Sequence, residues 1–135
     1  MAFIAINTYS GNTGLVTITL TAERKHFVFI IDTGSNVSHI DTEAAKLLQN
    51  STKLPIIDNS VTGIDGSLQS TGKIRQCFSS GIFTFDHEYF VTDLSSMAKV
   101  IEDNSGIHVH GILGTDFLVK YRCHLDFKKS RLHLG

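Results

Sequence analysis

The stretch Phe27-Val28-Phe29-Ile30-Ile31-Asp32-Thr33-Gly34-Ser35 decides the fold of this chain. Its five apolar residues are typical of a buried β-strand, and that strand leads directly into an aspartate. A carboxylate at the end of a buried strand is costly unless it has partners or a chemical task. Thr33 and Ser35 place hydroxyls beside it, and Gly34 permits a tight turn. An ordinary Asx turn at a strand end is the plainer interpretation of the same residues.

The composition indicates one folded domain over residues 1–135. Hydrophobic residues make up 41% of the chain and charged residues 19%, which are not the proportions of a disordered protein. The formal net charge of −1 gives no broad attraction to nucleic acid or to an anionic membrane, so neither is expected as a partner. No apolar run approaches the ~20 residues of a membrane span. No signal peptide is visible, so the cytoplasm is the default expectation, although a leader removed beforehand would leave the same sequence.

The two cysteines, Cys77 and Cys123, have neither metal-type nor redox-type spacing. Two buried free thiols are the expected state, with a single disulfide as the alternative.

Hydrophobic periodicity predicts a chain of short strands with few helices. Alternation of apolar residues and threonine over 15–21 is typical of a half-buried strand. Further strands are expected at 3–7, 27–31, 36–40, 69–78, 82–91, 108–113, 123–127 and 131–134. About ten strands and two helices indicate an all-β, barrel-like domain.

The two expected helices follow recognisable caps. Asp41 or Thr42 is expected to cap a helix over 43–49, with Ala45, Leu47 and Leu48 facing inward. Thr115 is expected to cap a second helix over 116–120. A short helix also begins within 93–99 in this interpretation, whereas 101–106 is expected to be a loop.

A second motif, Gly111-Ile112-Leu113-Gly114-Thr115-Asp116-Phe117-Leu118, follows the first in the order seen in one known family. A strand ending in Asp-Thr-Gly-Ser, a capped helix, a glycine-containing hairpin and a strand ending in Ile-Leu-Gly resemble the retropepsin-like aspartic proteases. These are the single-lobed relatives of the retroviral enzymes, with cellular and bacterial members. The resemblance covers residues 3 to 135 and implies a closed acid-protease barrel of the retropepsin type with one or two short helices.

The resemblance also implies roles for particular residues. The 112–114 strand would lie beside the Asp32 loop, and the hairpin around Gly63 to Gly66 would be the flap that covers substrate. Ser35 can hydrogen-bond the catalytic carboxylate in such a site. The implied catalytic residues are Asp32, Thr33 and Gly34, and the implied substrate-binding residues are Ser35, Gly63, Ile64, Asp65, Gly66 and Ile112. No metal or cofactor is implied.

Peptide hydrolysis by carboxylates needs two of them, because one acts as general base while its protonated partner polarises the scissile carbonyl. The sequence contains no second apolar strand leading to Asp-Thr-Gly or Asp-Ser-Gly. Asp116 follows Ile-Leu-Gly in the second motif, but a favourable charge interaction at a helix N-terminus explains it, with an ion pair to another subunit as the alternative. The sequence therefore predicts a homodimer in which Asp32 meets its copy across a two-fold axis.

Family resemblance further implies that Thr33 bonds to the partner's loop and that the terminal strands 3–6 and 131–134 help to join the subunits. The substrate would be a peptide or protein.

Two other functions stay open at this stage. A catalytically silent peptide-binding or dimerisation module could use the same fold. His108 and His110 flank Val109 and would face one side of a strand, so a metal-binding domain is the third possibility, although two histidines without a third ligand are weak evidence and exposed strand histidines are the plainer interpretation.

Overall fold

The computed structural model describes residues 2–8, 14–56 and 70–135. The proposed flap, Gly63 to Gly66, lies outside the described residues. The strands are β1 (Ala2–Ala5), β2 (Thr17–Ala22), β3 (Lys25–Ile31), β4 (His39–Asp41), β5 (Thr52–Leu54), β6 (Ser70–Ser80), β7 (Phe83–Thr92), β8 (Gly111–Leu113), β9 (His124–Asp126) and β10 (Arg131–Leu134). The helices are α1 (Thr42–Lys46), α2 (Ser95–Ser105) and α3 (Thr115–Lys120).

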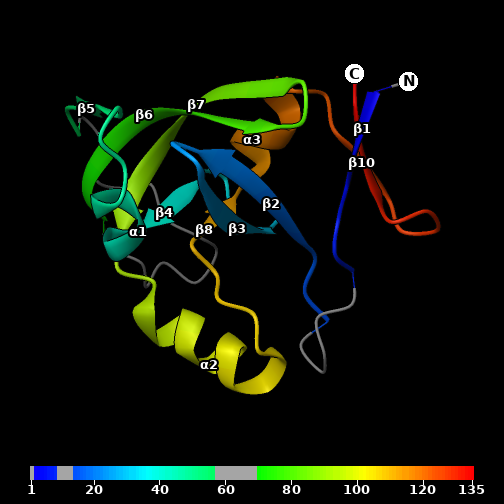
Figure 1. Cartoon of the computed structure of the whole chain (residues 1–135), viewed down its shortest axis with the longest axis horizontal. Coiled ribbons are helices and arrows are strands. Elements are labelled where there is room, and N and C mark those ends of the chain that lie inside the picture. Colours follow the sequence, from blue (N-terminus) through cyan, green and yellow to red (C-terminus); the bar gives the residue numbers. More distant parts are fainter. Residues whose placement is uncertain (1, 9–13, 57–69) are drawn as a thin grey trace.

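The main sheet closes into a barrel, as the sequence predicts. Its strand order is β2-β3-β8-β4-β7-β6-β5, and β2 also pairs with β6. Thr21 lies opposite Ser79 in that closing contact. Six strands therefore form the ring, and β5 lies outside it as an edge strand on β6 (Figure 1). Closure removes the free sheet edges that an open sheet of this size would expose.

One insertion in the strand order positions the candidate site. β8 lies between β3 and β4, parallel to β3 and antiparallel to β4. Residues 32–38, which connect β3 to β4, therefore have to pass the end of β8. The first motif and the second are thus brought together although about 80 residues separate them in sequence.

The two ends of the chain form a separate three-stranded sheet in the order β1-β10-β9. Ala2 lies opposite Leu134, so both termini lie side by side at one end of the molecule (Figure 1). The β9–β10 hairpin is confirmed. Buried Ile4 and Leu132 belong to the same apolar cluster as the barrel residues Phe29, Phe78 and Tyr89, so the small sheet shares the barrel's core.

The helices differ from the expectation in three details. α1 ends at Lys46, so Leu47 is exposed and Ala44 is buried in its place. Asp41 is the N-cap of α1 and accepts a hydrogen bond from the Glu43 N–H at 3.2 Å. The expected loop over 101–106 is wrong, because α2 continues to Ser105 and ends at Gly106, whose φ of +76° is a left-handed helix stop.

The third difference is at the start of α3. Thr115 does not cap this helix, since the N-cap is Gly114 and makes no side-chain cap bond. Among the described residues, no helix is long and apolar enough to cross a membrane.

Both cysteines are free, but they are not both buried. Cys77 is exposed because alternation along β6 turns its neighbours Gln76 and Phe78 inward. Cys123 is half-buried, and burial raises the pKa of its thiol to about 11, which leaves it protonated at neutral pH.

Candidate active site

The Asp32 loop is held by backbone hydrogen bonds to β8 and to α3. The Asp32 N–H donates to the Leu113 carbonyl at 2.9 Å, and the Thr115 N–H donates to the Ser35 carbonyl at 2.8 Å. Within the loop, the Gly34 N–H donates to Asp32 Oδ1 at 2.8 Å and the Ser35 N–H to the Asp32 carbonyl at 3.2 Å. These bonds fix where the carboxylate stands without using its second oxygen.

Ser35 does not bond the carboxylate as expected. Its side chain is buried, and Oγ donates instead to the Val37 carbonyl at 2.7 Å. Ser35 therefore shapes the loop, and the Gly34 N–H donates the hydrogen bond to the Asp32 carboxylate that the family resemblance implies for Ser35. Thr33 has an exposed side chain.

The two glycines of the second motif are required by close approach of other chain segments. A Cβ on Gly114 would overlap the Val37 carbonyl oxygen and would lie 2.7 Å from the Ser35 carbonyl oxygen. A Cβ on Gly111 would overlap the Phe29 ring and would lie 2.5 Å from the His39 carbonyl oxygen. Any side chain at these two positions would push the Asp32 loop or β4 away. The glycines of Gly-Ile-Leu-Gly therefore allow the Asp32 loop and β4 to pack directly against β8.

The Asp116 carboxylate makes hydrogen bonds to three other residues of its own chain, which is more than the expected charge interaction with a helix N-terminus. Ser38 donates to it twice, from N–H at 3.0 Å and from Oγ at 2.8 Å. His87 Nε2 lies 2.9 Å from Oδ2, and the Phe117 N–H donates to Oδ1 at 2.8 Å. Burial alone would raise the pKa of Asp116, but the bonds from His87 and Ser38 outweigh it, so the pKa is lowered.

These hydrogen bonds hold the C-terminal end of the Asp32 loop, residues 32–38, in place through Ser38. Ser38 Oγ, while donating to Asp116, also accepts the Gly114 N–H at 3.0 Å. The Ser38 hydroxyl thereby joins the end of the loop to the residue that follows β8, and the Asp116 carboxylate links Ser38 to His87 on β7. Sequence reasoning missed His87, which lies 29 positions away on β7 and carries no local signal of its role.

Strand parity places Asp32 on the outer face of the barrel. Phe29, Ile31 and Leu113 belong to the barrel core, so Ile30 and Ile112 face the opposite side. Asp32 follows the parity of Ile30. Ile112 is 4% exposed, so in the single chain it is largely covered, and its role in substrate binding stays a prediction.

His39 lies opposite Ile112 in the β4–β8 register and was not singled out from sequence. It is fully buried, with Nδ1 at 2.9 Å from Thr92 Oγ1, and within the described residues its Nε2 has no hydrogen-bond partner. Burial lowers the pKa of His39, while the negative charges of Asp116 and Asp32 oppose that effect. An uncharged imidazole thus lies on the face that carries Asp32.

His108 and His110 each have a partner inside the chain. His108 Nδ1 lies 2.7 Å from Glu102 Oε2, and His110 Nδ1 accepts the Val28 N–H at 2.9 Å. His110 is half-buried rather than exposed, and its pKa is lowered by burial and by the neighbouring His108. In the described ranges, no group of three or more His, Cys, Asp or Glu residues could hold a metal ion.

Comparison with known proteins shows the fold and leaves the activity open. No protein-family model and no curated protein sequence matches the chain. Among solved structures, the fold is similar to the retroviral protease-like domain of Ddi1 from Leishmania major, with a TM-score of 0.60 and 14% identity over 90% of this chain and 88% of that one.

A retropepsin-like aspartic protease from Rickettsia conorii is also similar, with a TM-score of 0.52 and 18% identity over 97% of this chain and 86% of that one. The chain therefore has the retropepsin-like fold that its two motifs predict. At these identities the likeness shows the fold alone, because one fold can host several functions.

Proposed function

We propose that the protein is an aspartic endopeptidase whose active site forms from the Asp32 residues of two chains. The observation that carries the proposal is the state of the Asp32 carboxylate. It stands at the end of a barrel strand, in a loop anchored by one backbone hydrogen bond to β8 and one to α3, and is only half-buried. Within the described residues its hydrogen-bond donor is the Gly34 N–H, which leaves one oxygen for chemistry.

The chemistry follows from two such carboxylates at close range. Two adjacent carboxylates cannot both ionise easily, so the pair shares one proton and its pKa values separate. The ionised member accepts a proton from water, and the protonated member polarises the scissile carbonyl. The two titrations belong to the pair of Asp32 residues and not to either chain.

A second copy is needed because the described part of this chain offers no other suitable carboxylate. Asp116, which follows the neighbouring strand, is already bonded to Ser38 and His87. The exposed Thr33 side chains are available to contact the partner's loop, as the resemblance implies. A symmetric dimer would bring two identical loops together across its axis.

The strand edges that could join two subunits belong to β1 and β9, whereas the resemblance implies β1 and β10. β1 and β10 pair with each other inside one chain. In the β1-β10-β9 sheet the outer edges belong to β1 and β9, so these edges are where a partner's strand would add. Phe3 on β1 is 40% exposed and Phe127, just after β9, is 62% exposed, which gives both edges apolar surface to cover.

The test combines cleavage with association state. Wild type, Asp32→Asn and the surface control Asp103→Asn are incubated with a random peptide library, and products are read by mass spectrometry. We expect cleavage by wild type and Asp103→Asn and none by Asp32→Asn, whose fold is checked by circular dichroism. Specific activity should rise with protein concentration until the dimer is saturated. Cleavage by a folded Asp32→Asn variant would refute the proposal.

The second candidate is a catalytically silent peptide-binding or dimerisation module on the same fold. The observation that favours its monomeric, peptide-binding form is the intrachain β1–β10 pairing, because these two terminal strands pair with each other without a partner chain. Sedimentation at micromolar concentration separates the two candidates. A strict monomer that binds peptides but leaves them intact would support the silent module.

A further inference from the structure

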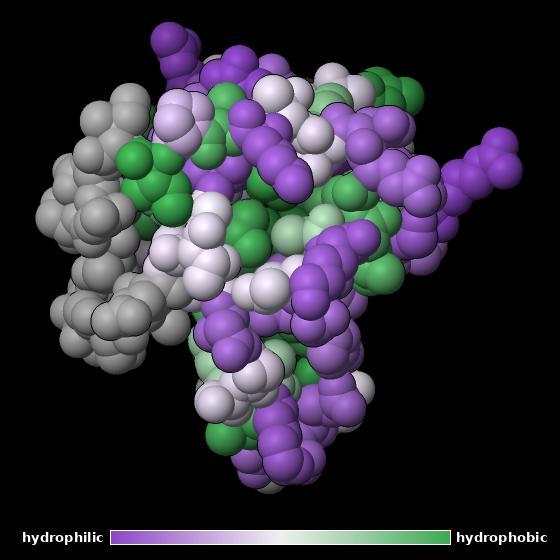
Figure 2. All heavy atoms as spheres, turned by 90° about the vertical axis from the view of Figure 1, so that its left-hand side faces the viewer, coloured by the Kyte–Doolittle hydropathy of each residue, from purple (hydrophilic) through white to green (hydrophobic). Residues whose placement is uncertain are grey.

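A cavity of about 560 Å³ lies between α1 and the β5–β6 strands, and nothing so far assigns it a role. Its volume is in the range of small-molecule sites. Residues of the Asp32 loop do not line it. Figure 2 shows the side of the molecule that carries β5 and α1, where apolar surface gathers near the centre between long polar side chains.

The floor of this cavity is apolar. Leu48 comes from the segment just after α1, Leu54 from β5, and Ile74 and Val91 from the paired strands β6 and β7. Burying apolar ligand surface against such a floor is favourable by about 25 cal/mol per Å². The floor therefore suits the body of an apolar ligand.

Among the described residues, the charged side chains that line the cavity are all lysines. They are Lys46, Lys53 and Lys73, and no aspartate or glutamate of the described ranges lines it. Lys46 is paired with Glu43 at 3.1 Å, and Lys73 is paired with Glu88 at 3.0 Å. In the described ranges no ion pair involves Lys53, so the cavity has one cation without a counter-ion.

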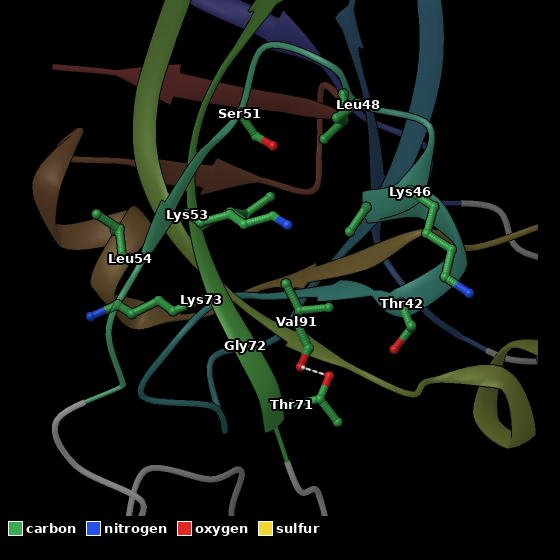
Figure 3. Close-up of a pocket in the computed structure, with 12 residues that line it drawn as sticks. Thr42, Lys46, Leu48, Ser51, Lys53, Leu54, Thr71, Gly72, Lys73 and Val91 are labelled. Carbon is green, nitrogen blue, oxygen red and sulfur yellow. Dashed lines mark hydrogen bonds between the residues drawn. The ribbon is translucent and has the colours of Figure 1, made fainter.

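The three lysine side chains also point in different directions (Figure 3). Lys53 extends from β5 across the cavity toward α1, whereas the amino groups of Lys46 and Lys73 point away from its middle. Lys73 Nζ lies 5.2 Å from the centre of the Phe90 ring, outside the cavity. Lys53 is therefore the charge that a ligand on this floor would meet.

We propose that this cavity binds a small carboxylic acid, with its apolar chain on the Leu48–Leu54–Val91 floor and its carboxylate on Lys53. A lysine ammonium has three donors and no acceptor, and the hydroxyls of Thr42 and Ser51 supply further donors around the rim. Thr71 Oγ1 already donates to the Val91 carbonyl at 3.4 Å. Since no described side chain that lines the cavity is a carboxylate, ligands rich in N–H groups are disfavoured. A fatty-acid-like molecule fits this set better than a peptide end. The proposal does not depend on proteolysis, because Asp32 takes no part in it.

The experiment titrates ¹⁵N-labelled protein with sodium octanoate below its micellar concentration and follows backbone amide shifts. We expect shifts to concentrate on α1, β5 and the start of β6, and saturation to give a dissociation constant. Lys53→Met should weaken binding about tenfold, since a charge-assisted hydrogen bond is lost. The matched surface variant Lys128→Met should bind as wild type.

A second variant and two further ligands keep the test decisive. Ala45→Leu fills the cavity from α1 and should abolish binding while Lys53 is kept. 1-Octanol should bind more weakly than octanoate, and so should N-acetylleucine. Equal binding of octanol, tighter binding of N-acetylleucine, unchanged affinity in Lys53→Met, or shifts that cluster elsewhere would each overturn the proposal.

Discussion

Asp32 and Asp116 follow two neighbouring parallel strands, yet the structure treats their carboxylates in opposite ways. Asp32 comes directly after β3, in a loop where Gly34 is its donor. Asp116 lies three residues after β8 and is bonded by Ser38, His87 and Phe117. In the described residues the Asp32 carboxylate has one oxygen without a hydrogen bond, while both oxygens of Asp116 are bonded and help to hold the loop. A sequence pattern shows two similar aspartates, and only their partners distinguish them.

Gly114→Ala should cause the largest loss, because it disturbs the supports of both carboxylates at once. A methyl group there would overlap the Val37 carbonyl, and its backbone neighbours cannot move independently. We expect a loss of about 3 kcal/mol or more in the free energy of unfolding, measured by urea denaturation. Gly72→Ala is the matched control, since its Cβ would meet Val91 at an ordinary 3.8 Å. Equal stability of the two variants would contradict the requirement for glycine at position 114, where the Asp32 loop packs against the chain.

Asp116→Asn should come next, with a loss of about 2 kcal/mol in the free energy of unfolding, because charge-assisted bonds to His87 and Ser38 are weakened. The coupling can be measured with His87→Gln in a double-mutant cycle. Losses that simply add would show that the two side chains do not act together. Asp93→Asn, on the exposed turn before α2, is the control with little expected effect.

Stability should also fall as the pH drops below about 6.5, the ordinary histidine pKa. The pKa values of His39 and His110 are lowered in the fold by burial, so the unfolded chain binds more protons in this range. The groups opposing this are Asp116 and Asp32 around His39, and Asp41 beside His110. Each histidine adds at most ~1.4 kcal/mol per pH unit to the slope.

Urea denaturation at several pH values gives that slope, and His39→Asn should reduce it while keeping an amide near Thr92. A slope that is the same in His39→Asn and wild type would show that His39 is not the titrating group. The carboxylates with lowered pKa values, Asp116 among them, contribute stability that is lost only at lower pH, near and below 4.

Asp32→Asn should have the smallest effect on folding, within about 0.5 kcal/mol of wild type in the free energy of unfolding. Within the described part of the chain, its half-buried carboxylate accepts one hydrogen bond, from the Gly34 N–H, and an asparagine oxygen can accept the same bond. Thermal denaturation checks this. A large destabilisation would mean that Asp32 is structural, like Asp116, and would weaken the proposed protease function as well.

The sequence predicted those parts of the structure that depend on local pattern. The apolar run 27–31 and the cap at Asp41 each have a physical reason within a few residues. The glycines of the second motif were found through the family resemblance, since their physical reason is the approach of residues 29–39 from a distant part of the chain. Leu47 and the 101–106 segment were misassigned because helix ends depend on single residues, and Gly106 was the overlooked stop signal. The partners of Asp116 could not be predicted, since His87 and Ser38 meet it only through the strand order.

The terminal sheet also has a consequence for how the chain folds. Ala2 pairs with Leu134, so the first strand cannot be completed until the last strand is present. Contacts between positions this distant in sequence make folding slow, because a long loop must close before they stabilise anything. Loss of 131–134 would leave Ile4 without Leu132 opposite it and would uncover one side of the barrel core. The first strand, β1, therefore reaches its native pairing only after the last strand, β10, has formed.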